Sequence, residues 1–312
     1  MKTKILITVL SVLLVSGCVD VDLGGLTDNQ GGGVAGNGLE ITSFTVEPST
    51  VFEDASIRLN MEIENRGGTT VDANEAMIYL TGSSFIDWSG ELYSMSKFID
   101  RTMNAEDVVR GVPASTYTYR PSGLKAPDLE AGQTNNYIFI GRVYSDYQTS
   151  ANGNIWVYSE TEAEAARAAG RQMYTPSFTY SKGPVGLSVS VTPSPVVLYE
   201  GGDNRITVYI KVSNLASGTI YDPDATIGLN DVGLTMDQIN RVYVDVIPGT
   251  GLSLVESEGC EGKQELVAGK DLTLICDLDV SDVDTFRSFP FQVDATYGYY
   301  TERTASVTVQ GR

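Results

Sequence analysis

Apolar and polar residues alternate strictly in several runs of this chain. Such runs occupy residues 57–63, 206–212, 242–246, 272–280 and 305–309. A period of two places all the apolar side chains of a strand on one face, so each run predicts a half-buried β-strand. Many short strands separated by polar turns predict an all-β protein, built as a sandwich of two sheets.

The two halves of the chain repeat one another. Four colinear blocks match: residues 57–65 with 206–214, 76–80 with 225–229, 129–132 with 266–269, and 139–147 with 289–297. The offset is 149 or 150 except in the third block, where it is 12 residues shorter. Matches in one order along both halves indicate duplication of a domain.

The sequence around the matched strands resembles a known class of repeat. The first copy has a strand that ends in Asn65-Arg66-Gly67-Gly68, then an apolar strand, and then Leu-x-Ala-Gly before another strand. This order resembles the CARDB-type and archaeal S-layer-associated Ig-like repeats. The resemblance implies two tandem Ig-like β-sandwich domains, residues 39–182 and 183–312. It also implies an extracellular adhesion or envelope module without catalytic residues.

Short helices are expected outside the strands. Thr235 and Gln238 have the spacing of a capping box, which predicts a helix start. Ser159 precedes an Ala-rich run and predicts a second capped helix. The apolar residues between 92 and 103 have roughly helical spacing and predict a third.

The N-terminus has the pattern of an export signal. Two lysines precede a short apolar stretch, residues 5–15, and Val15-Ser16-Gly17-Cys18 then resembles a lipobox. We therefore expect a signal peptide at residues 1–17, lipidation of Cys18 and a Gly-rich tether at residues 18–38. The protein would be extracytoplasmic and held to the membrane by its lipid. The alternative is an ordinary signal peptide with a chance cysteine.

The other two cysteines, Cys260 and Cys276, are expected to form a disulfide. Cys276 shares its strand face with leucines and so points inward, and export places both thiols in an oxidising compartment. The alternative is a pair of free buried thiols. Either role is structural.

The composition excludes several classes of site. The chain has no histidine, which excludes Ser-His-Asp and Cys-His catalysis and histidine-bound zinc. The formal net charge of −19 argues against nucleic acid as a partner, because its phosphates are repelled. We expect no cofactor and no enzymatic activity.

A group of aspartates is the one candidate metal site. Asp277, Asp279, Asp282 and Asp284 resemble part of a calcium loop, since carboxylate oxygens are the ligands that calcium prefers. The first two lie on the outward face of an alternating strand, where solvated acids are common. The expectation is therefore no metal, with calcium as the weaker alternative.

A binding surface is expected in the long excursion at residues 81–128 of the first copy. Of its aromatic residues, Trp88, Tyr93, Tyr117 and Tyr119 are the candidates for contact with a partner, because Trp and Tyr anchor many interfaces. The alternative is that the excursion folds down as core.

These observations predict a lipid-anchored cell-surface protein with a structural or adhesive role, bound to a surface protein or a glycan. Two alternatives stay open. One is a subunit that presents a ligand to a transporter or secretion complex. The other is a secreted hydrolase, for which paired carboxylates would be needed.

Overall fold

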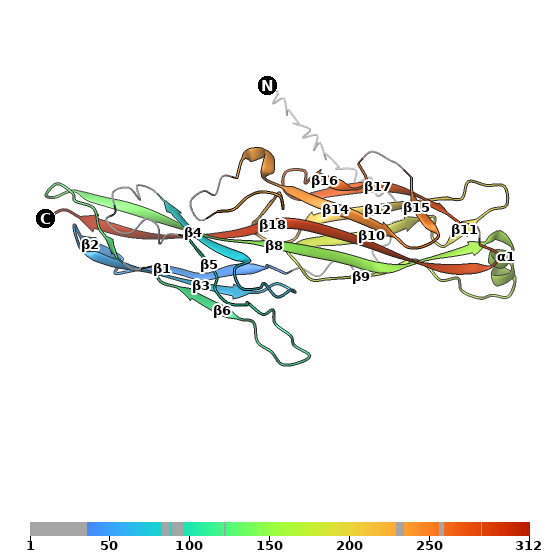
Figure 1. Ribbon diagram of the computed structural model, residues 1–312, viewed down its shortest axis with the longest axis horizontal. Helices are drawn as coiled ribbons and strands as arrows, with labels where there is room; N and C mark the ends of the chain where they lie inside the picture. Colours follow the sequence, from blue (N-terminus) through green and yellow to red (C-terminus); the bar gives the residue numbers. More distant parts are fainter. Residues whose placement is uncertain are drawn as a thin grey trace, which may run out of the picture.

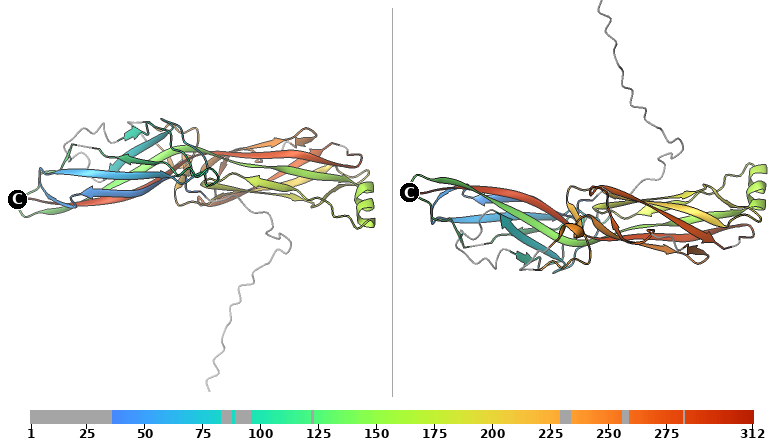
Figure 2. Two further views of the ribbon diagram at one scale, coloured as in Figure 1. Left: turned by 90° about the horizontal axis from the view of Figure 1, so that it is seen from below. Right: turned by 90° about the horizontal axis from the view of Figure 1, so that it is seen from above.

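The alternating apolar runs form β-strands, and the protein is an all-β sandwich, as the sequence predicts. The computed structural model describes residues 36–82, 88, 96–121, 123–228, 234–255, 259–281 and 283–312. Figure 1 shows an elongated molecule with two lobes end to end. In Figure 2, helix α1 (Glu160–Ala168) lies at one tip and the C-terminus at the other.

Two very long strands, β8 (Thr134–Ser159) and β18 (Phe286–Gln310), run through both lobes (Figure 1). They pair antiparallel, from Thr134 opposite Gln310 to Tyr158 opposite Phe286. Their midpoint, where the lobes meet, is called the waist. We define it by the opposed residues Tyr147 and Tyr297.

Each lobe adds its own shorter elements to the long pair. Those of lobe 1 are β1 (Leu39–Glu47), β2 (Thr50–Phe52), β3 (Ser56–Asn65), β4 (Ala76–Gly82), β5 (Ser96–Phe98), β6 (Thr116–Tyr119) and β7 (Leu124–Lys125). Those of lobe 2 are α1, β9 (Ser177–Tyr180), β10 (Val185–Thr192), β11 (Val196–Leu198), β12 (Arg205–Asn214), β13 (Thr219–Tyr221), η3 (Met236–Gln238), β14 (Arg241–Pro248), β15 (Leu252–Leu254), β16 (Gly262–Glu265) and β17 (Asp271–Val280).

The described strands form one shared sheet and two smaller ones. The shared sheet has ten strands, with β16-β14-β18-β8-β4-β5 as its main path. Lobe 1 adds a four-stranded sheet containing β1-β3-β6, and lobe 2 adds another in the order β10-β12-β17-β15. Each four-stranded sheet therefore packs against one half of the shared sheet.

The same face of the long strands covers both cores. Along β8 every odd-numbered residue from Tyr137 to Val157 is buried except Gly153, and the odd-numbered residues stay buried through the waist. Along β18 the odd-numbered residues from Phe289 to Thr301, and again Val307 and Val309, are buried, while Arg303 is exposed and Ala305 is half-buried. Because a strand's faces alternate with period two, both four-stranded sheets lie on one face of the shared sheet. Its even-numbered face, called the outer face below, carries no second layer of described sheet.

The duplication appears in the structure as a pseudo-two-fold axis. Tyr147 and Tyr297 are equivalent in the sequence repeat, 150 positions apart, and they also lie opposite one another in the ladder. An antiparallel ladder that pairs equivalent residues relates its two strands by a two-fold rotation. The axis therefore passes through the waist.

Each lobe is completed by a strand of the other copy. The last residues of β18 lie in lobe 1. There β18 pairs on one side with β8, which also pairs with β4, and on the other side with β2, where Val309 lies opposite Val51. In the same way the end of β8 pairs with β11 in lobe 2, where Tyr158 lies opposite Val197. The expected boundary between residues 182 and 183 falls in the loop before β10, while β8 and β18 each run through both lobes.

The structure confirms two of the expected local signals and corrects two others. Ser159 caps α1, and the capping box at Thr235 forms around η3. The expected helix over 92–103 is wrong in its described part, which contains β5, because pairing with β4 overrides the helical spacing. Residues 225–227 match part of β4 in the repeat but form no strand. In lobe 1, β4 pairs with β8; at the equivalent position in lobe 2, β14 pairs with β18 instead.

Candidate functional site

The aromatic residues expected to face a partner are mostly core residues. Trp88, Tyr117 and Tyr119 are 3%, 7% and 7% exposed, and Tyr93 lies outside the described residues. Trp88 packs edge-on against Tyr137 of β8, with ring centroids 5.4 Å apart. A side chain enclosed in this way has no surface to offer, so the expected binding surface is wrong for these three residues.

The reason is that the described part of the excursion folds onto the sandwich. β6 joins the four-stranded sheet of lobe 1 through β3, and β5 extends the shared sheet at β4. Tyr117 and Tyr119 are two apart on β6, so both point to its buried face. The corresponding segment of the second copy, residues 230–265, also folds onto the sandwich where it is described, and it supplies β14 to β16.

The disulfide between Cys260 and Cys276 is confirmed, with the two Cα atoms 5.2 Å apart. Cys276 lies on β17 in the four-stranded sheet of lobe 2, and Cys260 precedes β16 in the shared sheet. Both residues are buried. The bridge therefore ties the two layers of lobe 2 together.

The aspartates considered for calcium have other partners. Asp277 accepts a hydrogen bond from Thr207 at 2.8 Å, and Asp279 pairs with Arg205 at 3.2 Å. Asp282 lies outside the described residues, and Asp284 uses its backbone carbonyl to accept from Ser159. Within the described part of the chain, no group of three or more His, Cys, Asp or Glu could hold a metal ion.

Cys18 and the expected signal peptide lie outside the described residues. Among the residues that are described, no helix is long and apolar enough to cross a membrane.

Buried tyrosines hold the waist together. The Tyr147 hydroxyl accepts from the backbone N–H of Leu39 at 2.6 Å, where β1 begins. Its equivalent, Tyr297, accepts from Val185 at the start of β10 and contacts the Thr149 hydroxyl at 2.9 Å. Burial raises the pKa of Tyr147 to about 12, so the phenol stays neutral. These groups are structural.

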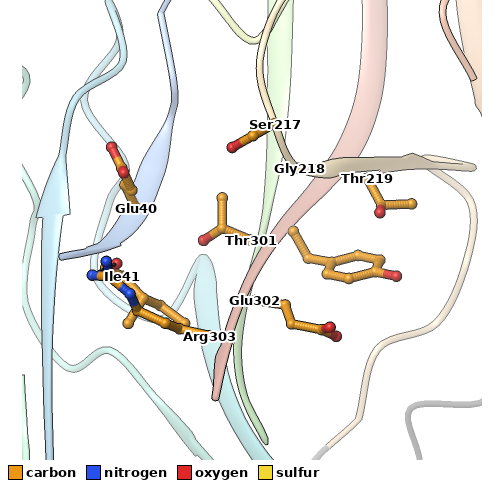
Figure 3. A pocket seen from close by; sticks show the side chains of 9 residues that line it. Glu40, Ile41, Ser217, Gly218, Thr219, Thr301, Glu302 and Arg303 are labelled. Atoms are coloured by element: carbon orange, nitrogen blue, oxygen red, sulfur yellow. Dashed lines mark hydrogen bonds between the residues drawn. The ribbon is translucent and has the colours of Figure 1, made fainter. Parts of the chain in front are cut away.

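A cavity of about 370 Å³ lies where β1 meets β18 at the waist (Figure 3). Its charged side chains are already paired within the protein: Glu40 with Arg66 at 3.1 Å, and Glu302 with Arg142 at 2.7 Å. Arg303 donates to the Ile41 carbonyl. Because these groups are satisfied, we assign this cavity to the junction between the copies and not to a ligand.

A second cavity, of about 340 Å³, opens on the outer face at the waist. We call it the Asp146 pocket; its lining includes Glu75, Met77, Phe98, Tyr144, Asp146 and Tyr221. The Tyr221 hydroxyl lies 3.4 Å from the Asp146 carboxylate. Desolvation by the aromatic walls raises the pKa of Asp146 above its usual range, and the nearby charge of Glu75 acts in the same direction.

Lobe 2 carries a partly exposed aromatic patch on its outer face, next to α1. We call it the Trp156 platform and define it as Trp156, Tyr174 and Phe286. The rings of Trp156 and Tyr174 are 4.8 Å apart at 32°, and those of Trp156 and Phe286 are 6.3 Å apart at 31°. Tyr174 is 60% exposed and Phe286 45%. The Tyr158 hydroxyl accepts from the backbone N–H of Tyr174 and so fixes the segment that carries it.

A shallow groove of about 590 Å³ continues from the platform along the outer face. It crosses four strands and is lined mainly by amide, hydroxyl and apolar groups, among them Asn152, Asn154, Thr179, Ile247 and Gln292. Asn154 is bonded to Ser288, which lies opposite Trp156 in the ladder. The groove and the platform therefore form one continuous surface.

Comparison with known proteins identifies no family. No family model matches the chain, and no curated protein matches it. The resemblance to CARDB-type repeats therefore stays a prediction.

Two solved structures overlap most of the chain at low similarity. One is the Enterococcus faecalis MSCRAMM ACE, described as binding its ligands by the collagen Hug model: 9% identity, 87% of this chain and 95% of that one, and a TM-score of 0.15. The other is the collagen binding domain of the Erysipelothrix rhusiopathiae surface protein RspB: 8% identity, 87% and 97% coverage, and a TM-score of 0.12. At these values neither structure carries an argument about this chain.

Proposed function

We propose that this chain is an exported, lipid-anchored, non-enzymatic surface protein that adheres to a partner through the Trp156 platform and the adjoining groove. The observation that carries the proposal is the platform itself. Its three aromatic residues are held at the tip of lobe 2, where Tyr174 and Phe286 are exposed to solvent and Trp156 is half-buried between them. Contiguous exposed apolar groups on a folded protein mark interaction sites, because their exposure is unfavourable unless a partner covers them.

The chemistry of the surface favours a glycan over a protein as the partner. Aromatic rings present broad apolar faces, against which the C–H faces of a sugar ring can stack. The groove beside them offers carboxamides and hydroxyls, which both donate and accept hydrogen bonds, as a polyol requires. Its lining contains no ionisable side chain, so a neutral oligosaccharide fits best.

The adhesive role is tested with arrays of neutral oligosaccharides and the labelled chain lacking residues 1–17. We expect the double variant Trp156→Ala, Phe286→Ala to lose binding at least tenfold, since aromatic anchors dominate binding energy. Tyr209→Ala, an exposed tyrosine on the other sheet of lobe 2, is the matched control and should bind normally. Equal binding by the double variant, or no glycan bound by the native chain, would overturn the proposal.

The proposal of a binding protein without catalysis is supported by the absence of histidine from the whole sequence. It is also supported by the ion pairs that engage Glu40 and Glu302 in the cavity where β1 meets β18. The proposed anchor at Cys18 rests on the lipobox-like sequence alone.

A further inference from the structure

A hairpin, residues 104–115, projects from lobe 1 and is called the finger below. Figure 1 shows it as the loop that extends from the body of the molecule next to β6. At its base the backbone N–H of Ser115 donates to the Asn104 carbonyl at 3.0 Å, and the backbone N–H of Asn65 donates to the Ser115 carbonyl at 3.1 Å. Because Asn65 pairs with Leu39 at the start of β1, the finger leaves the body close to the waist.

The tip of the finger is almost fully exposed. Val108 and Val109 are 81% and 97% exposed, and the side chain of Arg110 is 83% exposed. Gly111 follows in the left-handed conformation, with a φ of 67°, and no atom lies within 4 Å of the position that a Cβ would take. The Arg110–Gly111 peptide bond therefore stands at the end of a projection with open space around it.

Few bonds hold the tip in its turn. Asp107 and Val112 exchange two backbone hydrogen bonds, of 2.9 and 3.0 Å, and the Asp107 carboxylate accepts from the backbone N–H of Arg110 at 3.0 Å. The ion pair between Arg110 and Asp107, at 3.5 Å, is exposed to water and so adds little. None of these contacts involves a strand of the sandwich, so the tip can open locally while both sheets stay intact.

We infer that the finger is a processing site, at which an arginine-specific endoprotease hydrolyses the peptide bond between Arg110 and Gly111. Such a protease binds several residues of its substrate in extended form, which an exposed loop tip supplies more readily than a strand. It also takes the arginine side chain into a specificity pocket, which requires an exposed guanidinium. Water is the only co-reactant: the C–N bond breaks, Arg110 keeps the new carboxylate, and Gly111 becomes a new N-terminus.

Two other loop arginines, Arg101 and Arg171, are held more firmly. Arg171 follows α1 and forms an ion pair with Glu162 of that helix at 3.0 Å. Arg101 donates to the backbone carbonyl of Thr116, the first residue of β6. A cut after either residue requires its release from a helix or a strand, whereas a cut after Arg110 requires only the opening of a turn.

The two pieces made by this cut should stay assembled. Residues before the cut supply β1 to β5, and residues after it supply β6 to β18. β3 pairs with β6 and β4 pairs with β8, so each sheet of lobe 1 contains strands from both pieces. Cys260 and Cys276 both lie in the second piece, so the disulfide does not link the two. The product is a two-chain protein held together by strand pairing.

A lipid surface fits the finger less well than a protease does. The two exposed valines follow Glu106 and Asp107 directly in the sequence. These carboxylates would approach the membrane together with the apolar tip and lose hydration there, which opposes the gain from burying two valines.

The inference is tested by limited digestion of the chain lacking residues 1–17 with a low ratio of trypsin under native conditions. We expect the first products to be residues 18–110 and 111–312, identified by mass and by an N-terminal sequence that begins at Gly111, and to elute together in size exclusion. Arg110→Gln should slow the loss of intact chain at least tenfold. Arg171→Gln, the matched control at an exposed loop arginine, should be digested within twofold of the native rate.

Each outcome decides the inference. Cleavage at Arg110 that is lost in Arg110→Gln but not in Arg171→Gln would support it. A first cut at another residue, or equal rates for native protein and Arg110→Gln, would overturn it. Protection of Arg110 by phosphatidylcholine vesicles would also overturn it, since the tip would then belong to a membrane, and separation of the pieces without denaturant would refute the two-chain product. The inference takes only export from the proposed function, and the digestion does not depend on export, so either can fail alone.

Discussion

The exchange of strands between the copies predicts a crossed pattern of destabilisation. Val157 on β8 and Val307 on β18 occupy equivalent positions in the repeat, 150 residues apart, and are 0% and 1% exposed. Val157 belongs to the first copy but packs in lobe 2, while Val307 belongs to the second copy but packs in lobe 1. Replacing either by alanine should therefore weaken the lobe formed mainly by the other copy.

The size of the effect follows from the buried groups. Alanine removes two methyl groups, worth about 0.8 kcal/mol each, and leaves a small cavity, so the local loss is about 2 kcal/mol. Since 1.4 kcal/mol is a factor of ten, amide hydrogen exchange through local opening should accelerate roughly thirtyfold. A whole domain is stable by about 5–15 kcal/mol, so both variants should stay folded.

The assay is hydrogen exchange of two equivalent strands, β3 in lobe 1 and β12 in lobe 2. Val307→Ala should accelerate exchange in β3 and leave β12 nearly unchanged, and Val157→Ala should do the reverse. If each variant instead affected the lobe of its own copy, the strand exchange would be refuted. Equal acceleration of both strands in both variants would show a single cooperative unit and would refute the independence of the lobes.

Three further predictions concern bonds described above. Opening the disulfide by Cys276→Ser should lower the free energy of unfolding by about 3 kcal/mol in the loop-entropy picture, measured by urea titration; an unchanged midpoint would contradict it. Tyr297→Phe removes a buried hydroxyl that is hydrogen-bonded to the Thr149 hydroxyl and to the backbone N–H of Val185. The free energy of unfolding should fall by about 1–3 kcal/mol, and calorimetry should show Tm lowered by several degrees. Cys18→Ala should release the protein into the medium or leave it unprocessed, and a processed mutant that stays in the membrane fraction would rule out the lipid anchor.

Alternation in the sequence predicts which side chains are buried, but not which strand lies beside which. The runs at residues 57–63 and 206–212 correctly place β3 and β12 in the sandwich. The C-terminal end of β18 pairs with the start of β8, which belongs to the other copy. The alternation of apolar and polar residues does not distinguish this pairing from a pairing with a strand nearby in the sequence. Pairing depends on contacts between residues more than a hundred positions apart, so the exchange of strands is invisible to local patterns.

The Trp156 platform was not predicted from the sequence, and the burial of Trp88 was not predicted either, for a related reason. Trp88 has no alternating neighbours that fix its direction, so its burial against Tyr137 could not be predicted. Trp156 does have such neighbours: Ile155 and Val157 are buried core residues, and the residue between them must point to the opposite face. This signal was present in the sequence. The approach of Tyr174 and Phe286 to the same spot requires the fold.

The point at which the chain enters the rod has a mechanical consequence. Gly36, the first described residue, donates its N–H to the Gly183 carbonyl beside the waist, so the chain joins the rod near its middle. If the chain is anchored through Cys18 as proposed, the attachment point lies near the middle of the molecule, and the two lobes extend from it in opposite directions. A load at the tip of lobe 2 then acts about half the length of the molecule from the attachment point, so it exerts a torque that turns the long axis of the molecule toward the load. The Trp156 platform, at the tip of lobe 2, would thereby be turned toward the target that it binds.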